Sequence, residues 1–264
     1  MPFFPQFSSL FVPPYSPPPP AAPIAWYKAD VGVTYDGSDL VSAWADQSGN
    51  SYDATVYDAG YEPLYVPNHY NSLPWIYFNP DLSNDEKKLL ITPAILPLNY
   101  DTPFTAIGVI NANYTDLTQG GDAHRWLLQN GDSGDWLAGF DFGPYQDSEF
   151  FGSMFGKNLI GETNITGTEI ESGQDLFAIV SITNNGSQIE FFENGVSKGT
   201  GDPNDYSDAT LNTGEFTIGA QLGGGTVYLG AKFYLGELLI FDSALSSVER
   251  ESFENDLNTK WDIF

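Results

Sequence analysis

The sequence lacks cysteine altogether, and this absence excludes disulfides, thiolate zinc sites and cysteine nucleophiles. Extracellular β-domains of animals usually carry at least one disulfide, so we expect a microbial or viral source. Histidine is nearly absent as well. His69 and His124 are the only two in the chain, and neither lies in a motif that supports a catalytic triad or a zinc site.

Basic residues are scarce, since 9 Lys and Arg stand against 35 Asp and Glu and the formal net charge is −26. Such a chain repels the phosphates of nucleic acids and anionic lipid headgroups, so we expect neither as a partner. Long apolar runs are also missing: no stretch of about 18 apolar residues is present that could insert into a membrane. Solubility, cation binding and a salty habitat are three explanations for the acidic excess.

The first 23 residues differ in composition from the rest of the chain. Residues 1–27 contain no charge, so the positive region of a secretion signal is missing and we expect no such signal. Pro17 to Pro20 predict an extended polyproline II segment. Aromatic residues accompany the prolines, namely Phe3, Phe4, Phe7, Phe11 and Tyr15. Residues 1–23 therefore form either a tail that folds back on its own domain or an assembly arm that lies on a neighbouring subunit.

The remaining chain consists of short apolar segments separated by clusters of Gly, Asn, Asp, Ser and Pro, which is typical of an all-β domain. Aromatic residues make up 15% of the chain and are mostly Phe and Tyr, which favour strands. Strands are expected near residues 25–28, 40–45, 74–78, 104–111, 125–128, 137–142, 149–154, 176–183, 188–193, 196–198, 216–220 and 232–241. Asn194-Gly195 between two of them predicts a tight hairpin, because both central residues of such a turn need positive φ.

One helix is predicted, close to the end of the sequence. Ser246 followed by Glu249 fits a capping box at its start. Three apolar residues then recur at every fourth position and make one stripe, namely Phe253, Leu257 and Trp261. Many strands with a single late helix predict an all-β fold, a two-sheet antiparallel sandwich on which the helix docks.

Two groups of residues mark the ends of the expected domain. The first comprises Trp26 to Asp30, Val41 to Asn50 and Asp53 to Thr55, and the second Gly236 to Asp242, Ala244 to Ser246, Glu249-Arg250 and Lys260-Trp261. Both groups resemble the opening and the closing segments of laminin-G-like, concanavalin A-like jelly-roll domains. The resemblance implies one such domain over residues 24–264. It implies no single function, because the family includes sugar-binding modules, adhesins, virion proteins and glucanases.

We expect no enzymatic activity. A retaining glycosidase needs two carboxylates about 5 Å apart, and the related glucanases place them as Glu-x-Asp-x-Glu on one face of a strand. No such segment occurs here, and Glu169-x-Glu171 lies in a Gly- and Thr-rich stretch that is typical of a loop.

Calcium is the one cofactor that the sequence offers any place for. Residues 46–50 and 130–135 are rich in the carboxylate and amide oxygens that calcium prefers. The same residues are typical of ordinary turns, because Asp and Asn side chains bond to their own backbone there. Both interpretations stay open.

A ligand-binding edge is predicted around the second of these loops. Exposed aromatic rings stack on sugars while carboxylates bind their hydroxyls, and this region combines both kinds of side chain. The candidate residues are Trp126, Asp132, Asp135, Trp136 and Tyr145. The tryptophans would equally fit a protein core.

Two functions follow as hypotheses. The first is a virion structural protein, a phage capsid-decoration or tail-fibre component, made in the host cytoplasm. It would dock through its arm onto other virion proteins or onto itself, and analogy with decoration and fibre proteins favours a homo-oligomer such as a trimer. The second is a carbohydrate-binding module or adhesin, extracellular or on a microbial surface, with glycans as partners.

Overall fold

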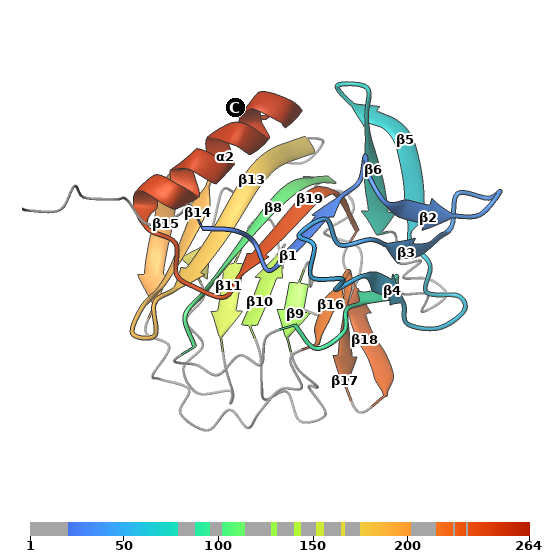
Figure 1. Ribbon diagram of the computed structural model, residues 1–264, viewed down its shortest axis with the longest axis horizontal. Coiled ribbons are helices and arrows are strands. Elements are labelled where there is room, and N and C mark those ends of the chain that lie inside the picture. Colours follow the sequence, from blue (N-terminus) through green and yellow to red (C-terminus); the bar gives the residue numbers. More distant parts are fainter. Residues whose placement is uncertain are drawn as a thin grey trace, which may run out of the picture.

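The computed structural model describes residues 21–78, 88–95, 102–113, 128–130, 140–143, 152–155, 165–166, 175–201, 215–223, 225–230 and 232–264. Two antiparallel sheets stack to form a jelly-roll sandwich, and one helix, α2 (Ser247–Trp261), lies across the outer face of one sheet (Figure 1). The structure therefore has three layers and confirms the predicted fold class.

The sheet under the helix contains β1 (Ala25–Lys28), β5 (Leu64–Tyr70), β6 (Leu73–Phe78), β8 (Phe104–Asn113), β13 (Asp175–Asn184), β14 (Ile189–Glu193), β15 (Val196–Gly201) and β19 (Phe233–Phe241). Its strand order is β15, β14, β13, β8, β19, β6, β5, and β1 also pairs with β19. The strands β6 and β1 follow one another along the same edge of β19, because β6 pairs with its first residues and β1 with its last.

The second sheet contains β2 (Val33–Tyr35), β3 (Val41–Trp44), β4 (Ala54–Val56), β7 (Leu90–Ile91), β9 (Leu128–Asn130), β10 (Phe140–Gly143), β11 (Gly152–Phe155), β12 (Ile165–Thr166) and β16 (Phe216–Ile218). Its order is β12, β11, β10, β9, β16, β7, β4, β3, β2. A separate hairpin is formed by β17 (Ala220–Gly223) and β18 (Thr226–Gly230). The sequence did not predict β2, β4, β5, β7, β12, β17 and β18, most of which are too short to show a period.

The hairpin between β14 and β15 confirms the prediction from Asn194-Gly195. Both residues have positive φ, 50° for Asn194 and 79° for Gly195, and the two strands pair antiparallel around them. A positive φ at both central positions matches the twist of the flanking strands. Local chemistry alone therefore specified this turn.

Large rings fill the space between the two sheets. The inward side chains include Tyr27, Trp44, Phe78, Phe104, Phe191 and Phe216, all fully buried. On β19, Leu238 and Ile240 point into this core, whereas the alternating residues Leu239 and Phe241 point to the other face, under α2. Both faces of this sheet are therefore covered with apolar contacts, which is why β19 is apolar almost throughout.

The helix α2 begins as the sequence predicted. Ser246 Oγ accepts a hydrogen bond from the Glu249 backbone N–H at 3.3 Å, and Glu249 Oε2 accepts one from the Ser246 N–H at 2.9 Å. These bonds satisfy donors that would otherwise lack partners at the start of the helix. Hydrogen bonding from Ser246 also holds the pKa of Glu249 below its ordinary value. Leu257 and Trp261 are buried against the sheet, as the apolar stripe predicted.

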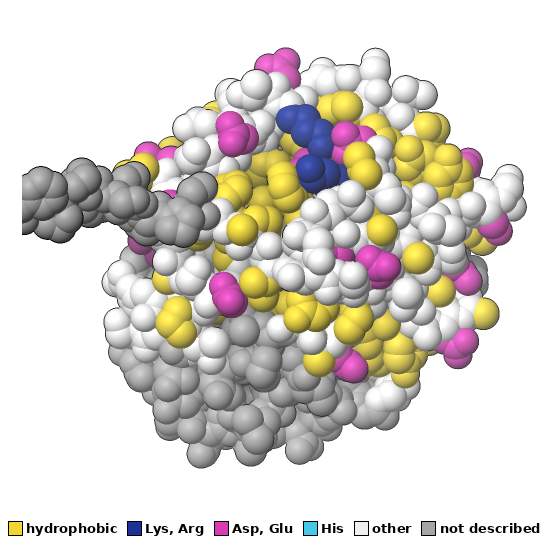
Figure 2. Space-filling model, viewed as in Figure 1, with side chains coloured by type: hydrophobic (Ala, Val, Ile, Leu, Met, Phe, Trp, Pro, Cys, Tyr) yellow, Lys and Arg dark blue, Asp and Glu magenta, His cyan; other side chains and the backbone are white. Residues whose placement is uncertain are grey.

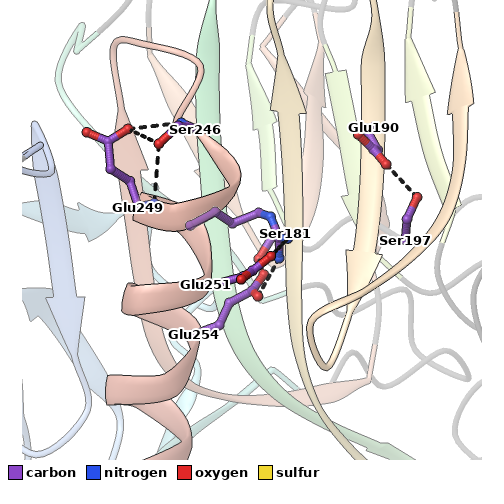
Figure 3. A network of polar contacts seen from close by, with 8 residues as sticks. Ser181, Glu190, Ser197, Ser246, Glu249, Glu251 and Glu254 are labelled. Carbon is purple, nitrogen blue, oxygen red and sulfur yellow. Dashed lines mark hydrogen bonds and ion pairs between the residues drawn. The ribbon is translucent and has the colours of Figure 1, made fainter.

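A buried ion pair fixes the middle of α2 to the sheet (Figure 3). Glu254 accepts a hydrogen bond from Arg250 one turn earlier and another from Ser181 Oγ of β13 at 2.5 Å. The Arg250 guanidinium also lies over the Phe192 ring, 3.6 Å from its centroid. A buried charge pair is costly to desolvate, so we expect it to fix one orientation of the helix more than to add net stability.

A second carboxylate, Glu237, fixes the end of α2. Its Oε1 accepts a hydrogen bond from Trp26 Nε1 at 2.6 Å, and its Oε2 accepts bonds from Trp261 Nε1 at 2.9 Å and Lys260 Nζ at 2.7 Å. A register shift between Leu235 and Glu237 turns this side chain to the helix-covered face.

The glycine inside this bulge makes room for the helix. A Cβ on Gly236 would lie 2.8 Å from the indole ring of Trp261, closer than any side chain could fit without displacement. The fully buried Trp261 ring therefore lies directly on the backbone of β19, which only a glycine permits.

Candidate functional site

The predicted ligand edge lies outside the described residues. This holds for every one of its members, namely Trp126, Asp132, Asp135, Trp136 and Tyr145. The aromatic residues of the proposed arm, Phe3, Phe4, Phe7, Phe11 and Tyr15, lie outside them as well, as do His124, Glu169 and Glu171. Both sites stay predictions, and so does the boundary of the arm at residue 23.

The buried carboxylates among the described residues all have structural partners. Glu193 pairs with Lys198 at 3.7 Å, Glu237 joins two tryptophans and a lysine, and Glu254 pairs with Arg250. Within the part of the chain that the structure describes, these groups hold the helix and the hairpin in place.

One segment carries the spacing of a serine nucleophile but not its structure. Residues 195–199 read Gly-Val-Ser-Lys-Gly, and a Gly-x-Ser-x-Gly elbow needs a sharp turn from a strand into a helix. Here the residues form the β14–β15 turn and the first part of β15. Ser197 Oγ donates to the Glu190 carboxylate at 2.6 Å (Figure 3) rather than to an imidazole.

His69 is part of an aromatic row on the helix-covered sheet. Its ring stacks on Tyr234 with centroids 3.7 Å apart, and Tyr234 stacks in turn on Tyr77 at 4.2 Å. The Asn111 amide donates to the Leu176 carbonyl, so its Oδ1 faces His69 and accepts a hydrogen bond from Nε2 at 2.8 Å. These contacts hold the tip of the β5–β6 hairpin down on the sheet.

The loop at Asp46, one of the two calcium candidates, is built as a tight turn. Asp46 Oδ1 accepts hydrogen bonds from the backbone N–H groups of Trp26 and Ser48, both at 2.8 Å. Its Oδ2 accepts from Ser48 Oγ at 2.6 Å and from the Tyr52 N–H at 3.1 Å. No group of three or more acids or histidines in the described ranges could hold a metal ion. Calcium binding stays a prediction, and the other loop lies beyond these ranges apart from Asn130.

The carboxylate of Asp46 gives the first testable prediction. Burial acts to raise its pKa, but the hydrogen bonds from Ser48, Trp26 and Tyr52 outweigh that effect, so the pKa lies below its ordinary value. A lowered folded-state pKa contributes stability above the unfolded pKa of about 3.9 and loses it as the pH falls through the folded pKa. We expect Asp46→Asn to cost about 1–3 kcal/mol at pH 7, since an amide nitrogen cannot accept these bonds. The deficit should shrink below about pH 4. Urea unfolding at both pH values measures it, and a pH-independent deficit would contradict the assignment.

A pair of stacked tyrosines lies where the two sheets meet at one edge of the sandwich. We call this region the tyrosine edge and define it as Val31, Tyr35, Asp36, Asp39 and Tyr65. The rings of Tyr35, on β2, and Tyr65, on β5, are stacked with centroids 4.3 Å apart and planes 13° apart. Tyr35 is 45% exposed even though one face of its ring lies against Tyr65. Figure 2 shows apolar side chains at the surface in the region where Figure 1 places β2, β5 and β6.

The loop beside Tyr35 is held rigidly against β5. Asp36 Oδ1 accepts hydrogen bonds from the N–H groups of Ser38 at 2.8 Å and Leu40 at 3.0 Å. The carbonyl of Asp39 accepts from the Tyr65 N–H at 2.8 Å. Asp39 is exposed, and no hydrogen bond or ion pair joins its carboxylate to another described residue. An open carboxylate therefore lies on a fixed backbone next to the tyrosines.

Burial, together with neighbouring charge, keeps the Tyr65 hydroxyl protonated. Burial raises the pKa of Tyr65 above its ordinary value, and Tyr35, Asp30 and Asp39 raise it further. The hydroxyl is thus a hydrogen-bond donor at all physiological pH values. This region could not be predicted from the sequence, because neither β2 nor β5 was predicted. No local pattern links two tyrosines that lie so far apart in the chain.

No model of a known protein family matches this sequence, and no curated protein matches it either. The fold is nevertheless similar to solved structures. The binding domain of Paraclostridial Mosquitocidal Protein 1 matches with a TM-score of 0.60 and 17% identity over 89% of this chain and 52% of that one. The binding domain of Botulinum neurotoxin DC, solved in complex with rat synaptotagmin II, matches with a TM-score of 0.60 and 14% identity, also over 89% of this chain and 52% of that one. A Trypanosoma rangeli sialidase in complex with sialic acid matches with a TM-score of 0.58 and 15% identity, over 89% of this chain and 33% of that one.

At these identities the likeness establishes the fold alone. The chain spans about half the length of the two binding domains and a third of the sialidase. Among the described residues, no helix is long and apolar enough to cross a membrane.

Proposed function

We propose that this chain is a non-catalytic binding module that attaches a larger particle or protein to a surface ligand. The observation that carries the proposal is the tyrosine edge, where Tyr65 fixes an exposed Tyr35 ring in one orientation. A rigid aromatic face at the surface is a common anchor for ligands, because little side-chain entropy is lost when it binds. The buried acids, by contrast, serve to hold the fold together.

The structural neighbours support this proposal without carrying it. Two of them are binding domains, one of a mosquitocidal protein and one of a neurotoxin, and the second was solved in complex with rat synaptotagmin II. A sandwich with loops and edges on a rigid scaffold suits recognition, and the fold is shared by proteins that do so.

The finer proposal is that the module belongs to a virion and docks through its first 23 residues. The described chain supports an attachment of the arm beside the helix at the arm's last residues, since Ala21 packs against the cluster under α2 and the Ile24 N–H donates to the Ile240 carbonyl at 2.7 Å. An extended, Pro-rich segment with regularly placed aromatic rings suits docking in a groove or on a strand edge of a second copy or of another virion protein. The acidic surface would then keep assembled particles apart.

Deletion of residues 1–20 tests the arm. Ala21 and Ile24 keep their contacts in this variant, so we expect its melting temperature to stay within about 2 °C of the full chain. Its oligomeric state, measured by light scattering at matched concentration, should fall to a monomer. A full chain that is monomeric and a deletion that joins particles as well as the full chain would together contradict the assembly role.

Binding itself is tested with the intact chain on immobilised cell envelopes and on an array of oligosaccharides and receptor proteins. We expect saturable binding to at least one surface without any release of reducing sugar. A chain that binds none of them, or that cleaves an arrayed glycan, would refute the proposed function.

A further inference from the structure

We propose that the tyrosine edge is a binding subsite for a neutral saccharide, with the Tyr35 ring as its platform and the Asp39 carboxylate as its hydroxyl acceptor. This inference rests on the proposed binding function and names the ligand class and the residues for it. It uses other residues than the sequence-based ligand edge around residues 126–145, and it lies where β2 and β5 form the edges of their sheets.

The first argument is the geometry of the ring. A pyranose presents a face of C–H groups whose partial positive charge matches the negative face of an aromatic ring. Such a contact needs one free ring face that does not rotate away. Tyr35 meets both conditions, since Tyr65 covers one face in a nearly parallel stack and 45% of the residue remains exposed. Phe264 is 51% exposed and has no ring partner among the described residues, so no stacked ring fixes its orientation as Tyr65 does for Tyr35.

The second argument is the polar rim. Sugar hydroxyls need acceptors as well as donors, and within the tyrosine edge Asp39 supplies an acceptor and Tyr65 a donor. The Asp39 carboxylate is exposed and unpaired within the described ranges, on a backbone that the Tyr65 N–H holds in place. The Tyr65 hydroxyl stays protonated and can donate. Gly37, in the loop between Tyr35 and Asp39, leaves open space, since a Cβ there would meet no atom within 4 Å.

The negative charge of the tyrosine edge favours neutral saccharides over anionic ones. Asp36 and Asp39 belong to the rim itself, and the whole chain carries a formal charge of −26. Two described cations are already engaged elsewhere. Lys260 is bound to Asp30 at 2.9 Å and to Glu237 at 2.7 Å, and Lys28, whose backbone pairs with Val31, has its Nζ 3.5 Å from the centroid of the Trp26 ring. Figure 2 shows the Lys and Arg side chains of this face in one place near the end of α2, whereas Asp and Glu side chains are scattered over it. A sialylated or sulfated sugar would meet uncompensated negative charge here, so the site fits a neutral one.

The alternative role for the pair is purely structural, as a seal between the two sheet edges. The two roles make different predictions for the Tyr35 side chain. A seal needs the ring for stability, whereas a subsite needs the outer ring face for binding. Tyr35→Phe keeps the aromatic ring and removes only its hydroxyl. Tyr35→Ala removes the whole ring and with it the face that a ligand would contact.

The experiment uses the full chain on an array of neutral gluco-, galacto- and mannooligosaccharides, with sialylated and sulfated versions of the same cores beside them. Titration calorimetry with the best neutral ligand then compares variants. We expect Tyr35→Ala to weaken binding about tenfold or more, which is about 1.4 kcal/mol, and Tyr35→Phe to stay within about threefold. Asp39→Asn keeps a residue that tolerates the positive φ of 62° and should weaken binding about three- to tenfold. Phe264→Ala is the matched control for loss of an exposed ring and should change nothing.

The other outcomes contradict either the site, the ligand class or the binding function as a whole. If Tyr35→Ala binds the neutral ligand as well as the parent chain, the site lies elsewhere while the binding function stands. If the chain prefers anionic sugars, or binds receptor proteins but no sugar, the ligand class is wrong and the binding function again stands. If it binds neither sugars nor receptor proteins nor cell envelopes, the proposed function fails together with the site. Melting temperatures of all variants separate these results from loss of folding.

Discussion

Glu237→Ala should destabilise the protein by about 3–5 kcal/mol, because it leaves two indole N–H donors without their acceptor and removes the buried partner of Lys260. Trp26 Nε1 and Trp261 Nε1 would each lose their hydrogen bond, and Lys260 would keep only Asp30 as a partner. The carboxylate is 1% exposed, so water cannot easily replace it. The loss is a large share of the total stability of a typical domain, about 5–15 kcal/mol. Urea unfolding followed by tryptophan fluorescence measures it.

Two variants control for this result. Glu237→Gln keeps the size of the side chain and one acceptor oxygen, so about half of the loss should return. Asp30→Ala removes the more exposed partner of Lys260 and should cost at most about 1 kcal/mol, as surface ion pairs do. If Glu237→Ala were no more destabilising than Asp30→Ala, the buried carboxylate would not be what fixes the end of α2.

Glu254→Ala is expected to have a comparable effect, about 3–5 kcal/mol, through a different residue. It leaves the guanidinium of Arg250 buried at 3% exposure, with Phe192 and the exposed Glu251 as its remaining partners. It also removes the acceptor of Ser181 Oγ. Thermal unfolding of the variant should shift downward, and the far-UV signal of α2 should be lost before that of the sheets.

The control replaces both charges together. Arg250→Met with Glu254→Leu fills the same space with apolar atoms and removes both desolvation penalties, so it should recover most of the lost stability. A double variant as unstable as Glu254→Ala alone would mean that the pair stabilises the protein by attraction rather than by avoiding an unpaired charge.

The local parts of the fold could be predicted from sequence because their causes are local. A Ser with a Glu three positions later supplies both partners of a capping box, and Asn-Gly supplies the two positive φ angles of a hairpin turn. The apolar stripe that includes Leu257 and Trp261 likewise predicts a helix with one buried face. These features needed no knowledge of distant residues.

The strand β5 could not be predicted because its local sequence argues against a strand. Pro67 lacks the N–H that a central strand needs, and Asn68 and His69 are polar. The strand forms at the edge of its sheet, where a register shift between Val66 and Tyr70 accommodates these residues. With β5 and the three-residue β2 unpredicted, the stacked tyrosine pair between them could not be anticipated either.

The sequence by itself determined the class of this protein: strands in rapid succession with one capped helix predict an antiparallel sandwich, and the resemblance of its opening and closing segments implies the jelly-roll kind. Only the tertiary structure decided the partners of particular side chains, such as Glu237 with two tryptophans and Tyr35 with Tyr65. The physical reason is range. Turns, caps and periodicity act over a few residues, whereas these partners lie in strands and helices that meet only when both sheets and the helix have packed together.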